Sequence, residues 1–166
     1  MKMSGLSSIY IENLMKICIL NIKKFIGVLS CDIFLNMTKN DKIKLSPGQG
    51  IILNLSSSNH PGSHWVAIFT NADGDAEFFD SFGVALFDSK IIEALQLQNL
   101  KVVNFEKMIQ DQNSIFCGFY CVAYLLCREV NISRNEFATF FYDNDLLKND
   151  YRCIEIIQNF VRIRGI

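Results

Sequence analysis

Proline, histidine and tryptophan are scarce in this chain of 166 residues, which contains 2 Pro, 2 His and 1 Trp. Pro47 and Pro61 both stand in one polar region, so neither interrupts a predicted helix. His60 and His64 are the only histidines, and they fall on a predicted loop and a predicted strand, not on one helical face. No Cys-x-x-Cys pair occurs either. We therefore expect no metal site and no metal cofactor.

Charge and long apolar runs are also limited. The formal net charge is −1, and no block of five basic residues occurs, so electrostatics give no footprint for a nucleic acid. No stretch of 18 apolar residues is present, which argues against a transmembrane helix and a membrane partner. Glu12 and Asn13 interrupt the first apolar segment, so we expect no secretion signal. The six cysteines are then expected to be reduced thiols in an intracellular protein.

Hydrophobic residues, in contrast, are abundant. They make up 50% of the chain, and 14 residues are Phe, which favours a well-packed core over disorder. The length fits one domain spanning residues 1–166. Periodicity predicts helices over 8–19, 89–97 and 115–127, a further helix after Ser133, and a last helix over 149–161. Strands are predicted over 51–55, 64–70, 76–80 and 101–105, with a loop over 36–50. The predicted fold class is α+β.

A cysteine near the start of the predicted buried helix is the candidate nucleophile. Cys117 lies three residues after Ser114, the predicted cap of that helix. The unpaired N–H groups and the dipole of a first helical turn stabilise a thiolate, which is the reactive form of a cysteine. The remaining cysteines are predicted to be small buried hydrophobic residues.

His64 and Asp80 are the candidate base and the candidate orienting acid. A short turn over 71–75 joins their strands into a hairpin, in which the start of one strand lies beside the end of the other. This geometry predicts that Asp80 lies next to His64 and orients its ring, as the third member of a nucleophile–base–acid set does. His60 is the rival base, but it stands in a polar loop and is expected to be solvated.

Gln110 is the candidate oxyanion donor. Its side-chain amide, together with the backbone N–H of Cys117, is predicted to bind the oxyanion of a tetrahedral intermediate. Gln112 remains the alternative donor. Gly118 and Trp65 are the predicted substrate-binding residues, because a glycine next to the thiol leaves room for a substrate carbonyl. Trp65 is expected either to pack in the core or to shield the neighbouring imidazole from water.

The order of these segments carries a family resemblance. His64-Trp65 comes first, FFDSFG at 78–83 second and IQDQNSIFCGFYC at 109–121 third. This order resembles that of the adenain-like proteases, which include the adenovirus maturation protease and proteases of Maverick/Polinton elements and other large DNA viruses. More distantly, it is similar to that of the SUMO-specific Ulp-type proteases. The resemblance covers the chain from about Ile51 to Cys127.

The resemblance implies a papain-like fold of the Ulp/adenain type, with a small mixed sheet and a buried helix that carries the nucleophile. It assigns Cys117 as nucleophile, His64 as base, Asp80 as acid and Gln110 as oxyanion donor. It implies a thiol protease, expected to be a monomer, that cleaves capsid or core precursors next to small residues such as glycine. The host nucleus, virus factory or virion would be its location.

The resemblance also brings in two possible activators, a viral peptide and DNA. In the adenovirus protease the viral peptide is attached through a disulfide. The cysteine of the protease that forms this disulfide corresponds to residues 98–100, where this chain has no cysteine. Two other functions stay open at this point. One is removal of ubiquitin-like modifiers by a Ulp-type isopeptidase, and the other is a binding role for a catalytically silent relative.

Overall fold

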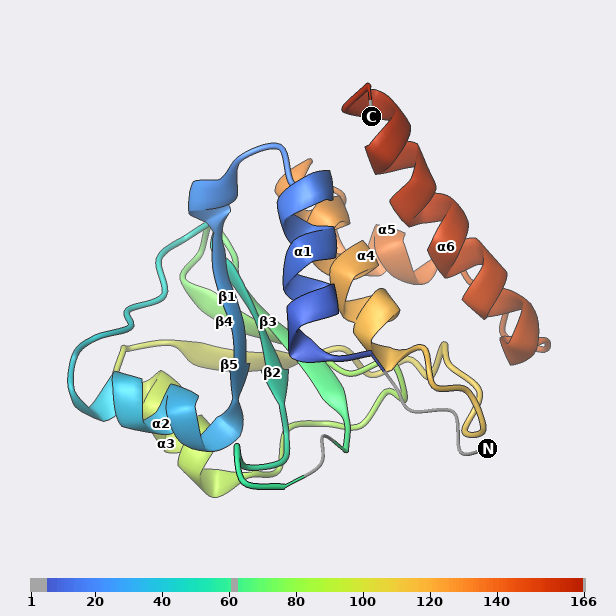
Figure 1. The fold of residues 1–166 in the computed structure, drawn as a ribbon. Helices are drawn as coiled ribbons and strands as arrows, with labels where there is room; N and C mark the ends of the chain where they lie inside the picture. The colour runs from blue at the N-terminus through green and yellow to red at the C-terminus, as the bar shows by residue number, and fades with distance from the viewer. Residues whose placement is uncertain (1–5, 61–62, 166) are drawn as a thin grey trace.

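Five strands and six α-helices are present in the computed structural model, which describes residues 6–60 and 63–165 (Figure 1). The helices are α1 (Ser8–Cys18), α2 (Cys31–Lys39), α3 (Ser89–Gln96), α4 (Cys117–Glu129), α5 (Arg134–Ala138) and α6 (Leu146–Ile163), with one short 3-10 helix at Ile22–Lys24. The strands are β1 (Phe25–Ser30), β2 (Gly50–Asn54), β3 (Trp65–Thr70), β4 (Asp75–Phe79) and β5 (Lys101–Asn104). The predicted α+β class is confirmed.

The strands form one mixed sheet in the order β1-β2-β3-β4-β5. The pairs β2–β3 and β3–β4 are antiparallel, whereas β1–β2 and β4–β5 are parallel. Every residue of β2 and β3 is buried, as continuous apolar runs in a sheet covered on both faces require. The tight hairpin between β3 and β4 pairs Thr70 with Ala76 and Ala67 with Phe79, and thus brings the start of β3 beside the end of β4.

Helices cover both faces of this sheet (Figure 1). On one face, α1, α4, α5 and α6 enclose a core into which Ile52, Ala67 and Phe79 project. On the other face, α2 and α3 cover the alternate residues of the same strands, such as Ile51, Ile68 and Phe78. Since successive side chains of a strand point to opposite faces, both cores are built from the same three strands.

Two elements were not predicted. Residues 36–39 belong to α2, so the prediction of a loop over 36–50 is wrong at its start. Strand β1 was missed because its burial follows no alternation and its pairing with β2 is interrupted between Phe25 and Val28. Gly27 lies at this irregularity with φ +148°, a conformation that favours glycine.

Helix α4 begins later than predicted. Its N-cap is Phe116, without a side-chain cap, and Cys117 is its first residue. The prediction that Ser114 caps this helix is therefore wrong, although the Ser114 hydroxyl does accept a hydrogen bond from the Phe116 N–H at 3.2 Å. Ser7 caps α1, Asp88 caps α3 and Ser133 caps α5, whereas α6 begins at Leu146 with Asp145 as its cap, earlier than the predicted start at residue 149.

An aromatic cluster fixes the end of β4 against α4. Phe79 stacks on Tyr124 with ring centroids 4.3 Å apart and an interplanar angle of 8°. Phe105 and Phe137 pack against the same pair at centroid distances of 4.9 and 5.7 Å from Phe79. Such contacts add to the hydrophobic stabilisation of burial. They also hold the residue after Phe79, which is Asp80, close to the start of the hairpin's first strand.

Candidate active site

Three candidate side chains come together where β3 begins, β4 ends and α4 begins. His64 directly precedes β3, Asp80 directly follows β4, and Cys117 is the first residue of α4. The Nε2 of His64 donates a hydrogen bond to Oδ1 of Asp80 at 2.9 Å. This bond leaves Nδ1 as the ring nitrogen not bound to Asp80, and the neighbouring Cys117 thiol also acts on the ring, since it raises the pKa of His64. The arrangement has the order of an acid, an imidazole and a thiol.

The charge of the imidazole depends on these two neighbours. Burial, the largest single effect, lowers the pKa of His64, but the hydrogen bonds and charges of Asp80 and Cys117 outweigh it. They raise the pKa of His64 from 6.5 to about 9. The imidazole of His64 is therefore protonated at neutral pH.

The other five cysteines lie in environments that disfavour a thiolate. Burial raises the pKa of all of them, and they are Cys18, Cys31, Cys121, Cys127 and Cys153. For Cys127 the pKa rises to about 12. All six cysteines are free, as the sequence predicts. Cys117 differs from the others by its place in the first turn of α4, where backbone N–H groups lack intrahelical acceptors.

Asp80, Phe82 and Gly83, in the turn after β4, each make a specific hydrogen bond or packing contact. Asp80 also accepts a hydrogen bond from the Phe82 N–H at 2.8 Å, which fixes its carboxylate. The Phe82 ring stacks on the His64 ring with centroids 5.0 Å apart. Gly83 has φ +71°, and a Cβ there would lie 2.6 Å from the Met108 backbone nitrogen. The roles of Phe82 and Gly83 were missed, although both stand in the motif that carries the resemblance.

Of the two candidate glutamines, Gln110 is buried and Gln112 is exposed. Gln110 is fully buried, and its Oε1 accepts a hydrogen bond from the Ser81 hydroxyl at 2.6 Å. Its Nε2 donates to the Ser114 carbonyl at 2.9 Å and lies 3.2 Å from the Ser114 hydroxyl. Gln112 is exposed. The structure therefore brings only Gln110 into the buried loop that leads to Cys117.

Gly118 and Trp65 do not face open space. A Cβ on Gly118 would lie 2.9 Å from Cδ1 of Ile11 and 3.2 Å from Cδ1 of Leu6. The expectation that Gly118 makes room for a substrate carbonyl is therefore wrong in this structure, because the room is filled by the segment around α1. Trp65 is 8% exposed, and its indole N–H donates to the Leu6 carbonyl at 3.0 Å. It packs in the core, which was one of its two expected roles.

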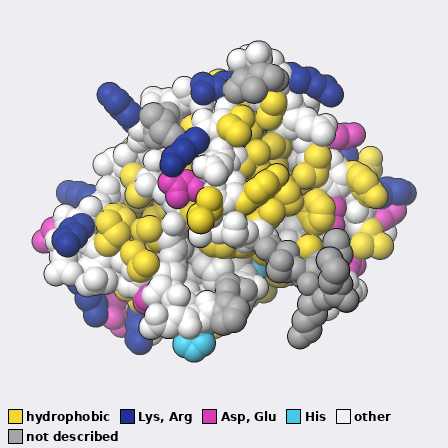
Figure 2. Space-filling model, viewed as in Figure 1, with side chains coloured by type: hydrophobic (Ala, Val, Ile, Leu, Met, Phe, Trp, Pro, Cys, Tyr) yellow, Lys and Arg dark blue, Asp and Glu magenta, His cyan; other side chains and the backbone are white. Residues whose placement is uncertain are grey.

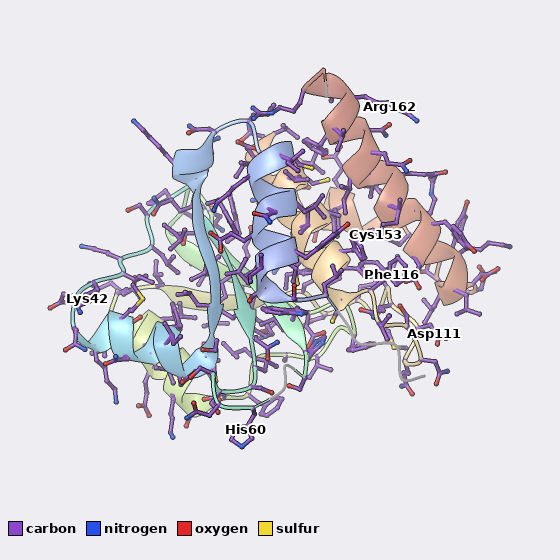
Figure 3. All side chains as sticks on the ribbon, in the orientation of Figure 1. Lys42, His60, Asp111, Phe116, Cys153 and Arg162 are labelled. Atoms are coloured by element: carbon purple, nitrogen blue, oxygen red, sulfur yellow. The ribbon has the colours of Figure 1, made fainter. Side chains whose placement is uncertain are left out.

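His60 lies apart from the three converging side chains. Figure 3 labels it at the edge of the molecule, and the cyan side chain at the lower edge of Figure 2 occupies the same place. It is exposed, and its Nδ1 lies 2.7 Å from the Ser57 hydroxyl. Within residues 6–60 and 63–165, no group of three or more His, Cys, Asp or Glu side chains is arranged to hold a metal ion. In the same ranges no helix has the length and hydropathy to cross a membrane.

The chain is similar to known cysteine proteases in sequence and in fold. No protein-family model matches the chain. A cysteine protease of African swine fever virus is 32% identical over 111 residues, which cover 60% of this chain and 41% of the viral protein. The chain thus spans less than half the length of that curated relative.

Two solved structures match the fold. Both are of the SUMO protease Ulp1, with the catalytic cysteine oxidised to a sulfinic or a sulfenic acid. They have TM-scores of 0.51 and 0.52 and sequence identities of 14% and 15%, and the match covers 95% of this chain and 79% of Ulp1. This chain has the Ulp1 fold. The predicted resemblance to adenain-like and Ulp-type cysteine peptidases is therefore confirmed, by sequence for the viral relative and by fold for Ulp1.

Proposed function

We propose that this chain is a cysteine endopeptidase in which Cys117 is the nucleophile, His64 the general base and acid, and Asp80 the group that orients His64. The observation that carries the proposal is the placement of these side chains together, with His64 Nε2 at 2.9 Å from Asp80 and the Cys117 thiol close enough to raise the pKa of the imidazole. The viral cysteine protease and the Ulp1 fold support the same reaction class.

The reaction follows from the geometry in two halves. The Cys117 thiolate attacks the peptide carbonyl carbon, and the carbonyl oxygen becomes an oxyanion. Collapse of this intermediate breaks the C–N bond, while the imidazolium of His64 gives its proton to the leaving amine. The neutral imidazole then takes a proton from water, whose oxygen attacks the thioester. The carboxylic acid product leaves, and the thiolate–imidazolium pair is restored.

Gln110 and the Cys117 backbone N–H are the proposed donors to the oxyanion. The support is their placement, since Gln110 is buried in the loop that enters α4 and Cys117 is the first residue of that helix. Losing one such donor costs on the order of 10²- to 10³-fold in kcat. Both Nε2 contacts of Gln110 are to Ser114, to its carbonyl at 2.9 Å and its hydroxyl at 3.2 Å, so one shared N–H can serve both and the other is the proposed donor to the oxyanion.

The proposed substrates are structural precursor proteins of a virus or a viral-type element, cut next to glycine inside the infected cell or the particle. The viral origin of the similar protease supports this choice. Removal of ubiquitin-like modifiers is the second candidate, and the Ulp1 fold favours it. The two differ in whether a folded modifier is needed. Preference for a folded ubiquitin-like domain ending in Gly-Gly over an unfolded peptide with the same ending would support the isopeptidase.

Covalent labelling tests the nucleophile and the base. We expect a Gly-Gly peptide vinyl sulfone to add once to the wild-type protein, as read by intact mass. Cys117→Ala should abolish the label, and His64→Ala should slow it. Cys31→Ala is the matched control, because the Cys31 thiol is the least buried of the other cysteines and should not be needed. A label that survives in Cys117→Ala, or a wild-type protein that takes none, would overturn the proposal.

A further inference from the structure

The amide of Gln110 has only one orientation that satisfies its neighbours. The Ser114 carbonyl, 2.9 Å away, can only accept a hydrogen bond, so it must face Nε2. Oε1 is then the atom 2.6 Å from the Ser81 hydroxyl, which donates to it. The backbone N–H of Gln110 donates to the Ser81 carbonyl at 3.1 Å. The candidate oxyanion donor is thus held from both sides by serines.

The Ser114 hydroxyl links this amide to helix α6. It lies 2.8 and 3.0 Å from the two carboxylate oxygens of Asp150, and a carboxylate only accepts hydrogen bonds. The hydroxyl proton therefore points to Asp150. Its two lone pairs are left for the Gln110 Nε2 and for the Phe116 N–H, each 3.2 Å away. One hydroxyl thus touches both the Gln110 amide and the residue that caps the nucleophile's helix.

Asp150 is in turn held by its place on α6. Cys153, Ile157 and Phe160 follow it on the buried face of this helix, and Figure 3 shows Cys153 on the part of α6 that lies beside Phe116. The Tyr120 hydroxyl, from the first turn of α4, donates to Asp150 Oδ1 at 2.9 Å. Burial raises the pKa of Asp150, and the hydrogen bonds from Ser114 and Tyr120 oppose this rise because they stabilise the carboxylate.

We propose that Asp150 and Ser114 are positioning residues that orient both halves of the oxyanion site, the Gln110 amide and the first turn of α4. This inference rests on the proposed peptidase function. Asp150 fixes the Ser114 proton, and the fixed hydroxyl then holds the Gln110 amide in one orientation and the Phe116 N–H in place. Neither residue touches the substrate. A preorganised donor stabilises developing charge without having to reorganise. Loss of Asp150 should therefore lower the rate of the chemical step, which is measured as kcat.

The test compares two reactions of the same thiol in the full chain. One is hydrolysis of a fluorogenic peptide amide ending in Gly-Gly, which passes through an oxyanion. The other is alkylation by iodoacetamide, which displaces iodide at a saturated carbon and forms no oxyanion. For Asp150→Ala and Ser114→Ala we expect kcat to fall 10-fold or more with KM within 3-fold, while the alkylation rate stays within 2-fold. The loss of one oxyanion contact lowers kcat by about this much.

A double-mutant cycle and a matched control make the result decisive. In the Gln110→Ala background, Asp150→Ala should lower kcat by less than about 3-fold, because the donor that it positions is already gone. Glu155→Gln removes a negative charge from an exposed site on the same helix and should leave both rates unchanged. A wild-type kcat retained in Asp150→Ala, or an equal loss of hydrolysis and alkylation, would overturn the inference. A wild-type protein that hydrolyses no substrate would instead overturn the peptidase function itself.

Discussion

Two buried ion pairs lie between the region of strand β4 and helix α4, and they differ in whether they can transfer a proton. At the start of α4, Asp80 pairs with His64 beside Cys117. Near the end of α4, Glu77 pairs with Arg128, whose Nε and Nη2 lie 2.8 and 3.1 Å from the carboxylate oxygens. The side chains of both pairs are largely buried, with exposures of 6% and 16% in the first and 8% and 12% in the second. Burial and pairing alone therefore do not distinguish the candidate site.

The difference lies in what remains available for chemistry. Glu77 also accepts a hydrogen bond from the Tyr124 hydroxyl at 2.7 Å, and Arg128 packs over the Phe69 ring and donates to the Ile132 carbonyl. A guanidinium stays protonated at all relevant pH values, so this cluster transfers no proton. In the other cluster, the imidazole can gain or lose a proton, and a neighbouring thiol raises its pKa. The comparison indicates that Glu77, on β4, is held in a fixed ion pair, whereas Asp80, directly after β4, is paired with a ring that can transfer a proton.

The largest expected effect is on activity, and it should differ between the carboxylates of Asp80 and Glu77. We expect Asp80→Asn to lower kcat/KM for a fluorogenic Gly-Gly peptide by about 10³- to 10⁴-fold. An asparagine N–H facing Nε2 stabilises the ring with its proton on Nδ1, which then cannot take the thiol proton. Glu77→Gln is the matched control and should change kcat/KM of the folded protein by less than about 3-fold. Equal losses in the two variants would show that the clusters do not differ in function.

The second prediction concerns the contribution of the Glu77–Arg128 pair to the free energy of unfolding. Arg128→Met keeps apolar contact with Phe69 but leaves Glu77 buried without its charge partner, so we expect the free energy of unfolding in urea to fall by about 3–5 kcal/mol. Replacing both charges, in Glu77→Leu with Arg128→Met, should recover most of this loss. A single variant as stable as the wild type would mean that Glu77 is solvated or protonated at no cost.

The sequence predicts the first cluster better than the second for a physical reason. His64 and Asp80 are joined by a short hairpin, whose geometry follows from local turn signals. Glu77 and Arg128 are 51 residues apart, and their contact depends on how α4 crosses the sheet. No local pattern encodes that crossing. The same limit applies to Asp150, which is 36 residues from Ser114.

Packing also decides the roles that the sequence assigned wrongly. A glycine next to the thiol is typical of a site that admits a substrate. Only the packing of α1 and of the residues just before it shows that Ile11 and Leu6 fill the space beside Gly118. Ser114 has the residue type of a helix cap, yet α4 begins after Phe116. Five helices, α1, α3, α4, α5 and α6, and the strands β2 to β5 were predictable because their apolar patterns and turn or capping residues are local.

The pH dependence of stability should come from the first cluster. In the folded protein the pKa of His64 is about 9, above its ordinary value of 6.5. Its stabilising contribution is therefore complete below pH 6.5 and is lost as the pH rises towards 9, with a total on the order of 3 kcal/mol. Urea unfolding of the wild type should show this fall between the two values, and His64→Gln should lack it. A parallel fall in both proteins would assign the dependence to other groups.

The smallest effect compares two tyrosines one turn apart on α4. Tyr124 donates to Glu77 and Tyr120 donates to Asp150, so removing each hydroxyl weakens a different carboxylate. We expect Tyr124→Phe to lower the free energy of unfolding by about 1 kcal/mol and to leave kcat unchanged, because Arg128 still neutralises Glu77. Tyr120→Phe should cost a similar amount of stability but also lower kcat a few-fold, since Asp150 then loses one of its two donors. If the two variants have the same kcat, then Tyr120 and Asp150 do not act on the proposed catalytic residues.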